Sequence, residues 1–357
     1  MLKKRTYKAV SLFSGAGGMD VGFKKAGIYP LLANDIDPDA CESYRKNHSD
    51  HPILQGDIKK YFSDLKQHKG IDFIFGGPPC QGFSIAGKMN PADARNELLM
   101  VYADIVGLLL PKMFVCENVK ALAVLEKWRG IRESFLERVA KNYSVEMFVL
   151  NSRDFCVPQN RERVFFVGIH KDIFELHNSL LKKIFSKELA FFENKSQSIK
   201  DVVLKLGAAG TGTNKRVCKA KITFAKSPVL RRSPYAGMLF NGAGRPLPSE
   251  GLSSTLPASM GGNKTPIIDE GVIFSQKDSF VEKYHTYLMR GGRPYSGEAP
   301  VQLRRMTIDE CLAIQTFPSD YYLHGAQSSM YRQIGNAVPP LFAYAVAQSA
   351  ANLLEQA

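Results

Sequence analysis

The sequence predicts an α/β protein with a doubly wound, mostly parallel sheet and a smaller loop-rich lobe. Through the first ~170 residues, apolar segments of strand length alternate with helical patterns. A glycine-rich turn follows the first of these segments, and beyond Lys171 short runs broken by glycine, proline, serine and threonine replace the alternation. Because a chain of 357 residues exceeds the size at which one core usually stops growing, two lobes are expected.

The alternation defines the expected elements in order. Strands are expected at 7–13, 31–33, 71–75, 113–116, 146–150 and 164–169, with helices at 95–110 and 127–142 between them. From 198 to about 303 we expect little regular helix. A helix then resumes over 307–317, where Thr307 and Glu310 form a capping box. The alanine-rich segment 341–354 is apolar on more than one side, which predicts a helix buried against the sheet of the first lobe.

The charge of the chain indicates a polyanionic partner. The formal net charge is +13, and nine basic residues but no acidic residue lie between Asp201 and Glu250. An ordinary solvated surface mixes both signs, although it remains the alternative explanation. The apolar run 9–13 is too short for a signal peptide and no segment is long enough to span a membrane, so we expect a cytoplasmic protein. The six cysteines form no C-x2-4-C pair, so neither a metal site nor a disulfide framework is expected.

Cys80 is the first candidate for chemistry. It lies in the segment GGPPCQGFS, directly after the apolar run 71–75. The carboxyl ends of strands are where open α/β sheets place their ligands, and the two prolines fix the backbone ahead of the thiol. Cys80 is therefore a candidate nucleophile, with a buried structural cysteine as the alternative.

The glycine-rich turn and two acidic residues indicate a nucleoside site. The segment from Gly15 to Asp20 lacks the third glycine of the dinucleotide pattern G-x-G-x-x-G. Asp35 follows the second expected strand, where an acid would hold the two ribose hydroxyls, and Asp57 follows the next short strand, where it could meet an adenine edge. The pattern predicts a nucleoside site without a pyrophosphate cradle.

Taken together, these segments resemble the ordered motif set of the cytosine-C5 DNA methyltransferases. The resemblance extends from Ser11 to Pro340 and also rests on the motifs PPCQ at 78–81, ENV at 117–119, QNRER at 159–163 and QIGNAVP at 333–339. It implies the class I fold of methyltransferases that use S-adenosyl-L-methionine and release S-adenosyl-L-homocysteine, without a metal. It also implies duplex DNA as the substrate.

The resemblance further implies which residues hold the methyl donor. They follow the first three strands and the PPCQ motif, or belong to the carboxyl-terminal motif: Phe13, Gly15, Gly17, Met19, Asp35, Ile36, Asp57, Ile58, Pro78, Leu98, Asn336 and Val338. The family often has glutamate where Asp35 stands, so Asp37 is an alternative partner for the ribose.

The chemistry explains the catalytic residue types. Cytosine C5 is a poor nucleophile until a thiolate adds to C6, which assigns the addition to Cys80. A free thiol is mostly protonated at neutral pH, and Arg161 and Arg163 would supply nearby positive charge. Glu117 would protonate ring atom N3, and Arg163 would donate to the base carbonyl. The alternatives are a helix cap or loop acid for Glu117 and a strand-edge salt bridge for Arg163.

The target cytosine must leave the duplex stack, so the basic lobe is expected to bind DNA in the major groove. The expected divisions are a catalytic domain at 1–175, a target recognition domain at 176–303, and a hinge with a returning helix at 304–357. Within the hinge, the motif at 304–307 would pack the recognition lobe against the catalytic lobe. The candidate DNA contacts are Ser84, Arg231, Arg232, Arg245, Thr255, Leu256, Asn263 and Lys264.

Several functions remain open. A monomeric modification enzyme acting at the bacterial nucleoid, with a cognate restriction endonuclease, is the expected one. A solitary regulatory DNA methyltransferase is the first alternative, and a tRNA cytosine-C5 methyltransferase is disfavoured because no Cys-Phe-Thr element occurs. A DNA-binding protein without activity would be expected to lack Cys80 or Glu117, and the missing third glycine argues against a nicotinamide dehydrogenase.

Overall fold

The computed structural model describes residues 5–79, 97–174 and 177–356. The chain forms two compact units. The first unit comprises Met1–Phe155, Arg161–Asn194 and Val338–Ala357, and the second comprises Cys156–Asn160 and Lys195–Ala337. No helix in the described ranges is both long enough and apolar enough to span a membrane.

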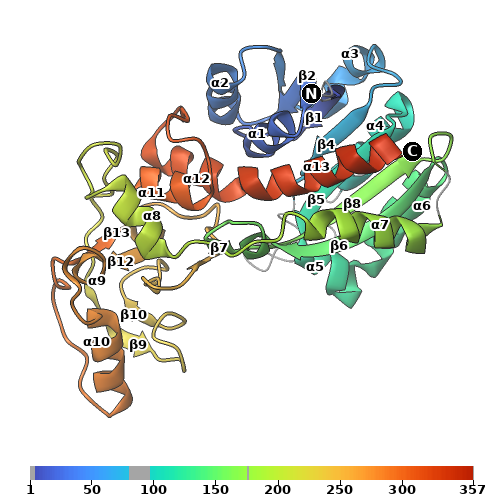
Figure 1. The fold of residues 1–357 in the computed structure, drawn as a ribbon. Coiled ribbons are helices and arrows are strands. Elements are labelled where there is room, and N and C mark those ends of the chain that lie inside the picture. Colours follow the sequence, from blue (N-terminus) through green and yellow to red (C-terminus); the bar gives the residue numbers. More distant parts are fainter. Residues whose placement is uncertain (1–4, 80–96, 175–176, 357) are drawn as a thin grey trace. The chain divides into compact units, whose positions relative to one another are not determined.

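A seven-stranded sheet forms the centre of the first unit, in the order β3-β2-β1-β4-β5-β8-β6 (Figure 1). The strands from β3 to β5 pair in parallel, whereas β8 is antiparallel to both β5 and β6. This confirms the predicted mostly parallel sheet. Its strands are β1 Tyr7–Leu12, β2 Ile28–Asp35, β3 Ile53–Gln55, β4 Phe73–Gly76, β5 Met113–Val119, β6 Tyr143–Asn151 and β8 Glu162–His170.

Helices cover both faces of this sheet because side chains alternate along each buried strand. In β4, Ile74 belongs to the core shared with α4 and α6, whereas Phe75 stacks on Phe23 of α1 with ring centroids 3.9 Å apart. Helices α1, α7 and α13 pack together, as do α3, α4 and α6. The helices are α1 Gly18–Lys25, α2 Pro38–Asn47, α3 Phe62–Lys66, α4 Glu97–Leu109, α5 Lys120–Val124, α6 Arg129–Ala140, α7 Asn178–Ala190 and α13 Pro340–Gln356.

Two glycines permit close backbone contacts in this unit. A Cβ atom at Gly76 would lie 1.9 Å from the carbonyl oxygen of Leu12, where β4 pairs with β1. A Cβ atom at Gly22 in α1 would lie 2.5 Å from the carbonyl oxygen of Pro340 at the start of α13. The carboxyl-terminal helix is thus fixed directly against the helix that follows the glycine turn.

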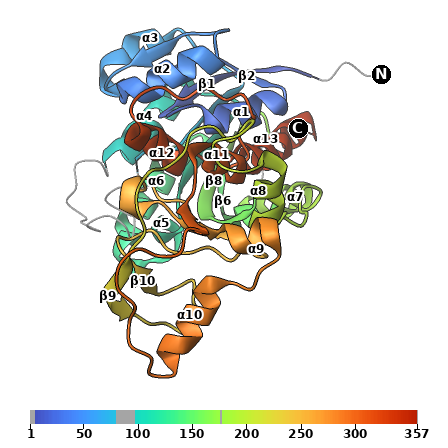
Figure 2. The same cartoon turned by 90° about the vertical axis from the view of Figure 1, so that its left-hand side faces the viewer.

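The second unit combines short strands with short helices (Figure 2). Helix α10 packs its buried Tyr284 and Leu288 into a core that includes Phe240 of β10 and Ile267 of β12. The elements are β7 Gln159–Asn160, α8 Ile199–Leu206, β9 Phe224–Val229, β10 Met238–Phe240, β11 Ser253–Ser254, β12 Ile267–Asp269, α9 Glu270–Ser275, α10 Phe280–Met289, β13 Leu303–Arg305, α11 Ile308–Ile314 and α12 Gln327–Asn336.

The expectation of little regular helix between 198 and 303 was wrong, because α8, α9 and α10 lie there. Helix α8 begins with a capping box of Ser198 and Asp201, and its buried residues Ile199, Val202 and Val203 recur at helical spacing, a local signal that the expectation overlooked. The observed division also differs from the expected boundaries. Helix α7 belongs to the first unit, and the segment from β13 through α12 belongs to the second.

Candidate active site

The glycine turn follows β1 and opens α1. Phe13, Gly15 and Gly17 all adopt positive φ angles, of 54°, 55° and 91°. Glycine tolerates this conformation because it has no Cβ, whereas it is uncommon for phenylalanine. A Cβ atom built at Gly15 would meet no described atom within 4 Å, so the described residues leave space beside the turn. Met19, in the first turn of α1, is buried.

Asp35, at the end of β2, connects the strand to this turn. Its carboxylate accepts hydrogen bonds from the backbone N–H groups of Gly15, at 2.7 Å, and Asp37, at 2.8 Å. Burial raises the pKa of Asp35, while these N–H groups oppose the increase. The adjacent Ile36 has 67% of its surface exposed, which places an apolar side chain beside the carboxylate.

Three further candidates for binding the methyl donor also have structural roles. Asp37, the alternative to Asp35, caps α2 by accepting from the N–H groups of Asp39 and Ala40. Asp57 accepts from the N–H group of Lys59 at the start of a short 3₁₀ helix, and Ile58 is buried in the core. The side chain of Ile58 is therefore much less accessible to a ligand than that of Ile36.

The candidate catalytic acid is paired with a candidate catalytic arginine. Glu117 lies in β5 and Arg163 in the adjacent β8, at diagonally neighbouring positions on one face of the sheet. Arg163 Nε lies 2.9 Å from Glu117 Oε1, and their side chains are only 14% and 12% exposed. The helix-cap alternative for Glu117 is excluded because Val119 occupies the cap position of α5.

The segment leading toward Cys80 contacts this pair. A Cβ atom at Gly77 would lie 2.8 Å from Glu117 Oε2, so a larger residue there would require the carboxylate to shift. Asn118 Nδ2 donates to the carbonyl oxygen of Pro78 at 3.2 Å. The edge formed by β4 and β5 thus fixes the backbone just before the candidate nucleophile. Cys80 itself lies outside the described residues.

The remaining candidate site residues are mostly buried. Arg161, between β7 and β8, is only 2% exposed, and its backbone N–H donates to Asn151 Oδ1. Leu98 packs against the core at the start of α4, and Val338 is buried ahead of α13. Asn336 is the last residue of α12 in the second unit.

Six of the candidate DNA contacts are exposed in the second unit: Arg231, Arg232, Arg245, Thr255, Asn263 and Lys264. The segments around Arg245 and Asn263 adjoin, because Gly244 N–H donates to the Asn263 carbonyl oxygen at 3.1 Å. Leu256 is fully buried, so its side chain packs inside the unit. Thr255 is exposed, although its hydroxyl donates to the carbonyl oxygen of Asn160. Ser84 lies outside the described residues.

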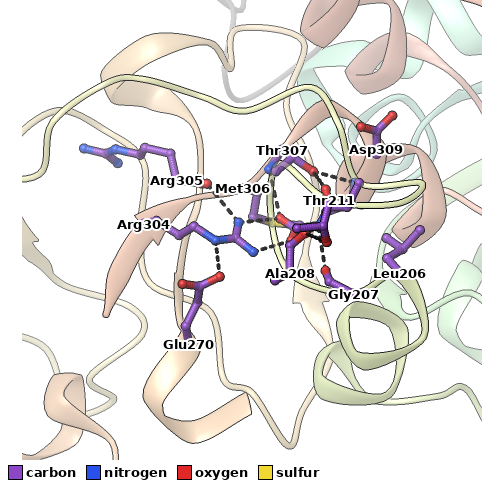
Figure 3. A network of polar contacts seen from close by, with 12 residues as sticks. Leu206, Gly207, Ala208, Thr211, Glu270, Arg304, Arg305, Met306, Thr307 and Asp309 are labelled. Atoms are coloured by element: carbon purple, nitrogen blue, oxygen red, sulfur yellow. Dashed lines mark hydrogen bonds and ion pairs between the residues drawn. The ribbon is translucent and has the colours of Figure 1, made fainter. Parts of the chain in front are cut away.

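A charged network, shown in Figure 3, holds the predicted capping box in place. The side chain of Arg304 lies 2.6 Å from Glu270 Oε1 and 2.5 Å from Oε1 of the fully buried Glu310. Glu310 also accepts from Thr307 N–H at 2.9 Å, which confirms the capping box. Asn214 contacts both Glu310 and Thr307. Burial disfavours the charged arginine, yet the two carboxylates raise the pKa of Arg304 overall.

Sequence reasoning missed the role of Arg305. It is 1% exposed and donates to the carbonyl oxygens of Asn241, Gly244 and Thr265. Burial lowers its pKa to about 10. No sequence signal identified these partners, because backbone carbonyls carry no residue identity.

The fold and the glycine turn define the class of the protein. The first unit is a class I methyltransferase fold, and two solved structures share the fold along the chain. A putative DNA modification methyltransferase from an E. coli prophage has a TM-score of 0.67 and 22% identity, with 98% of this chain and 100% of that chain covered. The Dnmt2 methyltransferase of S. pombe has a TM-score of 0.65 and 18% identity, with 98% of this chain and 99% of that chain covered.

Sequence comparison identifies the family. The model of the C-5 cytosine-specific DNA methylase family matches residues 7–352, so the chain belongs to that family. Type II methyltransferase M1.HphI of Haemophilus parahaemolyticus is 31% identical, over 95% of this chain and 85% of its own length. Type II methyltransferase M.FnuDI of Fusobacterium nucleatum is 30% identical, over 96% of this chain and 93% of its own length. The chain is therefore a DNA cytosine-C5 methyltransferase, and the family uses S-adenosyl-L-methionine.

The residues of the first unit fit this methyl donor. Among the described residues nothing fills the space beside Gly15, and the Asp35 carboxylate at the edge of the turn suits the two ribose hydroxyls. The exposed Ile36 beside it offers the apolar surface on which an adenine ring can pack. Nothing in the turn provides the extended phosphate cradle of a dinucleotide site.

Proposed function

We propose that this enzyme methylates C5 of a cytosine flipped out of a specific duplex DNA sequence, with Cys80 as the covalent nucleophile. The observation that carries the proposal is the Glu117–Arg163 pair, which lies against Gly77. The Glu117 carboxylate lies beside the backbone that leads directly to the thiol, and Arg163 is held next to this carboxylate. Glu117, Arg163 and Cys80 would therefore act on the same base.

The proposed reaction begins when the Cys80 thiolate adds to C6 of the base. The C5=C6 electron pair shifts to form C4=C5, the C4=N3 pair moves onto N3, and Glu117 transfers its proton there. C5 is then nucleophilic, and the bound donor supplies an electrophilic methyl group. Afterwards a base removes the C5 proton, the C5=C6 bond re-forms and the thiolate leaves, while N3 returns its proton to Glu117. We assign the removal of the C5 proton to water or hydroxide.

The two arginines would act differently. The Nε atom of Arg163 holds Glu117, and we assign its terminal nitrogens to the base carbonyl, where negative charge develops. Arg161 is too buried to be a surface contact, so we propose that it contributes a fixed positive charge from within the protein. Both would favour the thiolate form of Cys80.

We assign donor binding mainly to the turn and to the ends of β2 and β3. Asp35 would hold the ribose hydroxyls, Ile36 would pack on the adenine and Asp57 would meet its polar edge. The turn itself would hold the methionine part of the donor through its backbone. Pro78, Leu98, Asn336 and Val338 are proposed to complete the site, together with Phe13, Gly15, Gly17, Met19 and Ile58.

We propose that the second unit recognises DNA. Flipping a base costs a few kcal/mol, and contacts to phosphates and to base edges must offset that cost. The exposed Arg231, Arg232, Arg245, Asn263 and Lys264 are suited to such contacts, and the acid-free segment between Asp201 and Glu250 avoids repelling the backbone. We propose contacts from Thr255 and Ser84 as well, and a supporting role for the buried Leu256.

The biological role that we propose follows the relatives, which are named Type II methyltransferases. Such an enzyme would act as a monomer on bacterial DNA at the nucleoid and protect its sites from a cognate restriction endonuclease. A solitary regulatory enzyme would carry out the same reaction without that partner. Sequencing 5-methylcytosine in DNA from cells that express the protein would give its recognition site, and cutting by an endonuclease of that specificity would test protection.

A substrate experiment tests the reaction itself. Tritiated S-adenosyl-L-methionine is supplied with duplex DNA or with tRNA, and the label in each nucleic acid is counted. We expect label in DNA that is lost in the Cys80→Ala variant. Labelled tRNA with unlabelled DNA would replace the proposal with the tRNA function.

A further inference from the structure

A buried acid lies directly behind the glycine turn. Asp20 is in the first turn of α1 and has no exposed surface. The hydroxyl of Tyr44, from α2, lies 2.8 Å from Asp20 Oδ1. Both helices belong to the first unit, where they flank β2 (Figure 1). The reaction proposed above gives this carboxyl no role.

Asp20 is one end of a chain of polar groups that reaches the surface. The Tyr44 hydroxyl lies 2.7 Å from Nε2 of His51, and His51 Nδ1 lies 3.1 Å from Asp50 Oδ1. Asp50 is 55% exposed and pairs with Lys24 at 2.6 Å. The three contacts between Asp20 and Asp50 therefore cross from the interior of the unit to solvent.

The hydrogen bonds from Asp20 to Asp50 need one more proton than the neutral side chains supply. Each of the three contacts needs one hydrogen between its two heavy atoms. Tyr44 supplies one hydrogen and a neutral His51 supplies one, which leaves one contact without a hydrogen when Asp20 and Asp50 are both ionised. The chain is complete only with one additional proton, held either by Asp20 or by His51.

The same groups contact the turn that precedes α1. Val21 N–H donates to the Gly17 carbonyl oxygen at 3.0 Å, so the turn continues directly into the helix that carries Asp20. The ring of His48 packs on Tyr44, with centroids 4.4 Å apart, and interacts with the backbone carbonyl of Gly17. Movement of Tyr44 would therefore reach the turn from two directions.

We propose that Asp20 is a positioning residue for the methyl-donor turn, and that one proton held in the Asp20–Tyr44–His51 chain orders this turn for donor binding. The inference rests on the proposed function, because the donor is S-adenosyl-L-methionine. Loss of the proton breaks one hydrogen bond of the chain and weakens donor affinity.

The surrounding charges determine where the proton resides. Burial raises the pKa of Asp20 to about 6, although the hydroxyls of Tyr44 and Ser11 and the charge of Lys24 oppose this increase. Burial also lowers the pKa of His51, and lowers that of His48 to about 3. On the side of α1 that faces α13, the charge of Lys25 lies over the ring of Tyr344, 4.8 Å from its centroid. The proton thus resides on Asp20 and leaves near pH 6.

Asparagine provides a sharp test at this position. In the Asp20→Asn variant the amide donates to the Tyr44 oxygen, which completes the chain at every pH without an additional proton. In Tyr44→Phe two of the three contacts are lost at every pH. Asp64→Asn, an exposed carboxyl in α3 of the same unit, is the matched control.

Donor affinity is measured by calorimetry at pH 5.5 and pH 8, with S-adenosyl-L-methionine and with S-adenosyl-L-homocysteine, which lacks the positive sulfonium. One hydrogen bond corresponds to about five-fold in Kd, so the wild type and Asp64→Asn should bind both ligands about five-fold more weakly at pH 8. Asp20→Asn should bind equally at both pH values with the stronger affinity, and Tyr44→Phe, which lacks two of the three contacts, should bind equally at both and at least as weakly as the wild type at pH 8.

Identical pH profiles for the wild type and Asp20→Asn would overturn the inference, as would a wild-type affinity that does not change between the two pH values. Donor binding in either case leaves the proposed function intact. A wild-type protein that binds neither ligand at either pH would instead refute the proposed function, and the positioning role would fall with it.

Discussion

Replacing Glu117 with glutamine tests the proposed proton transfer most selectively. The amide keeps the size of the side chain but has no acidic proton to give to N3 of the base. General acid catalysis contributes about 10² to 10⁴ in rate, so we expect turnover to fall by ~10³, equivalent to about 4 kcal/mol in the activation free energy. The substitution also replaces the charged partner of the nearly buried Arg163, 2.9 Å away, with a neutral amide oxygen, which should lower the free energy of unfolding by about 2 kcal/mol.

Single-turnover methyl transfer to duplex DNA, with saturating donor, isolates the chemical step. Glu162→Gln is the matched control, because Glu162 is the adjacent acid on β8 and pairs with Lys120 at the surface, 2.7 Å away. We expect the control to stay within about two-fold of the wild type, since exposed ion pairs contribute little. Donor Kd should be unchanged in both variants. A Glu117→Gln rate close to that of the wild type, or an equal loss in the control, would refute the assignment.

Three further predictions concern stability. Gly76→Ala should lower the free energy of unfolding by about 3 kcal/mol in urea denaturation, because its Cβ would lie 1.9 Å from the Leu12 oxygen, whereas Gly130→Ala in α6 meets no described atom and should cost nothing. Glu310→Ala should cost about 3 kcal/mol, because it removes one of the two carboxylates that pair with the buried Arg304 and the acceptor of the Thr307 N–H group, while Glu270 remains; Glu133→Ala, which removes an exposed partner of Arg129, should cost less than about 1 kcal/mol, and equal losses would contradict this. The native pKa of Asp20 is raised from 3.8 to about 6, so the native state binds more protons than the unfolded state in that range, and stability should fall by about 2 kcal/mol as the pH rises from 4 to 7. Asp20→Asn should remove this contribution, and a pH dependence identical to that of the wild type would contradict it.

The sequence predicted most of the first unit because its signals are local. Runs such as Phe73 to Phe75 are apolar and of strand length, and the capping box at Thr307 and Glu310 depends on residues three positions apart. The antiparallel placement of β8 between β5 and β6 could not be derived in this way, because strand order depends on contacts between distant segments. The short helices of the second unit were missed because the glycine, proline, serine and threonine residues around them indicated loops, although α8 repeats apolar residues at helical spacing.

The candidate site shows the same division. Glu117 and Arg163 were both predicted from motifs, but their ion pair follows from the register of β5 and β8, which no motif specifies. Ile36 and Ile58 occupy equivalent places in the sequence pattern, yet one is exposed and the other is in the core. The contacts of Asp20 with Tyr44 join residues 24 positions apart and left no signal in the sequence.

Covalent trapping tests the central claim most directly. A duplex that carries 5-fluorocytosine at the methylated position blocks the final elimination, because fluorine does not leave as a proton does. With S-adenosyl-L-methionine present, we expect the wild-type enzyme to form a DNA complex that survives denaturing electrophoresis, and folded Cys80→Ala to form none. A denaturation-resistant complex with Cys80→Ala, or methyl transfer to ordinary duplex DNA by a wild type that traps no fluorinated DNA, would contradict attack by Cys80 on C6.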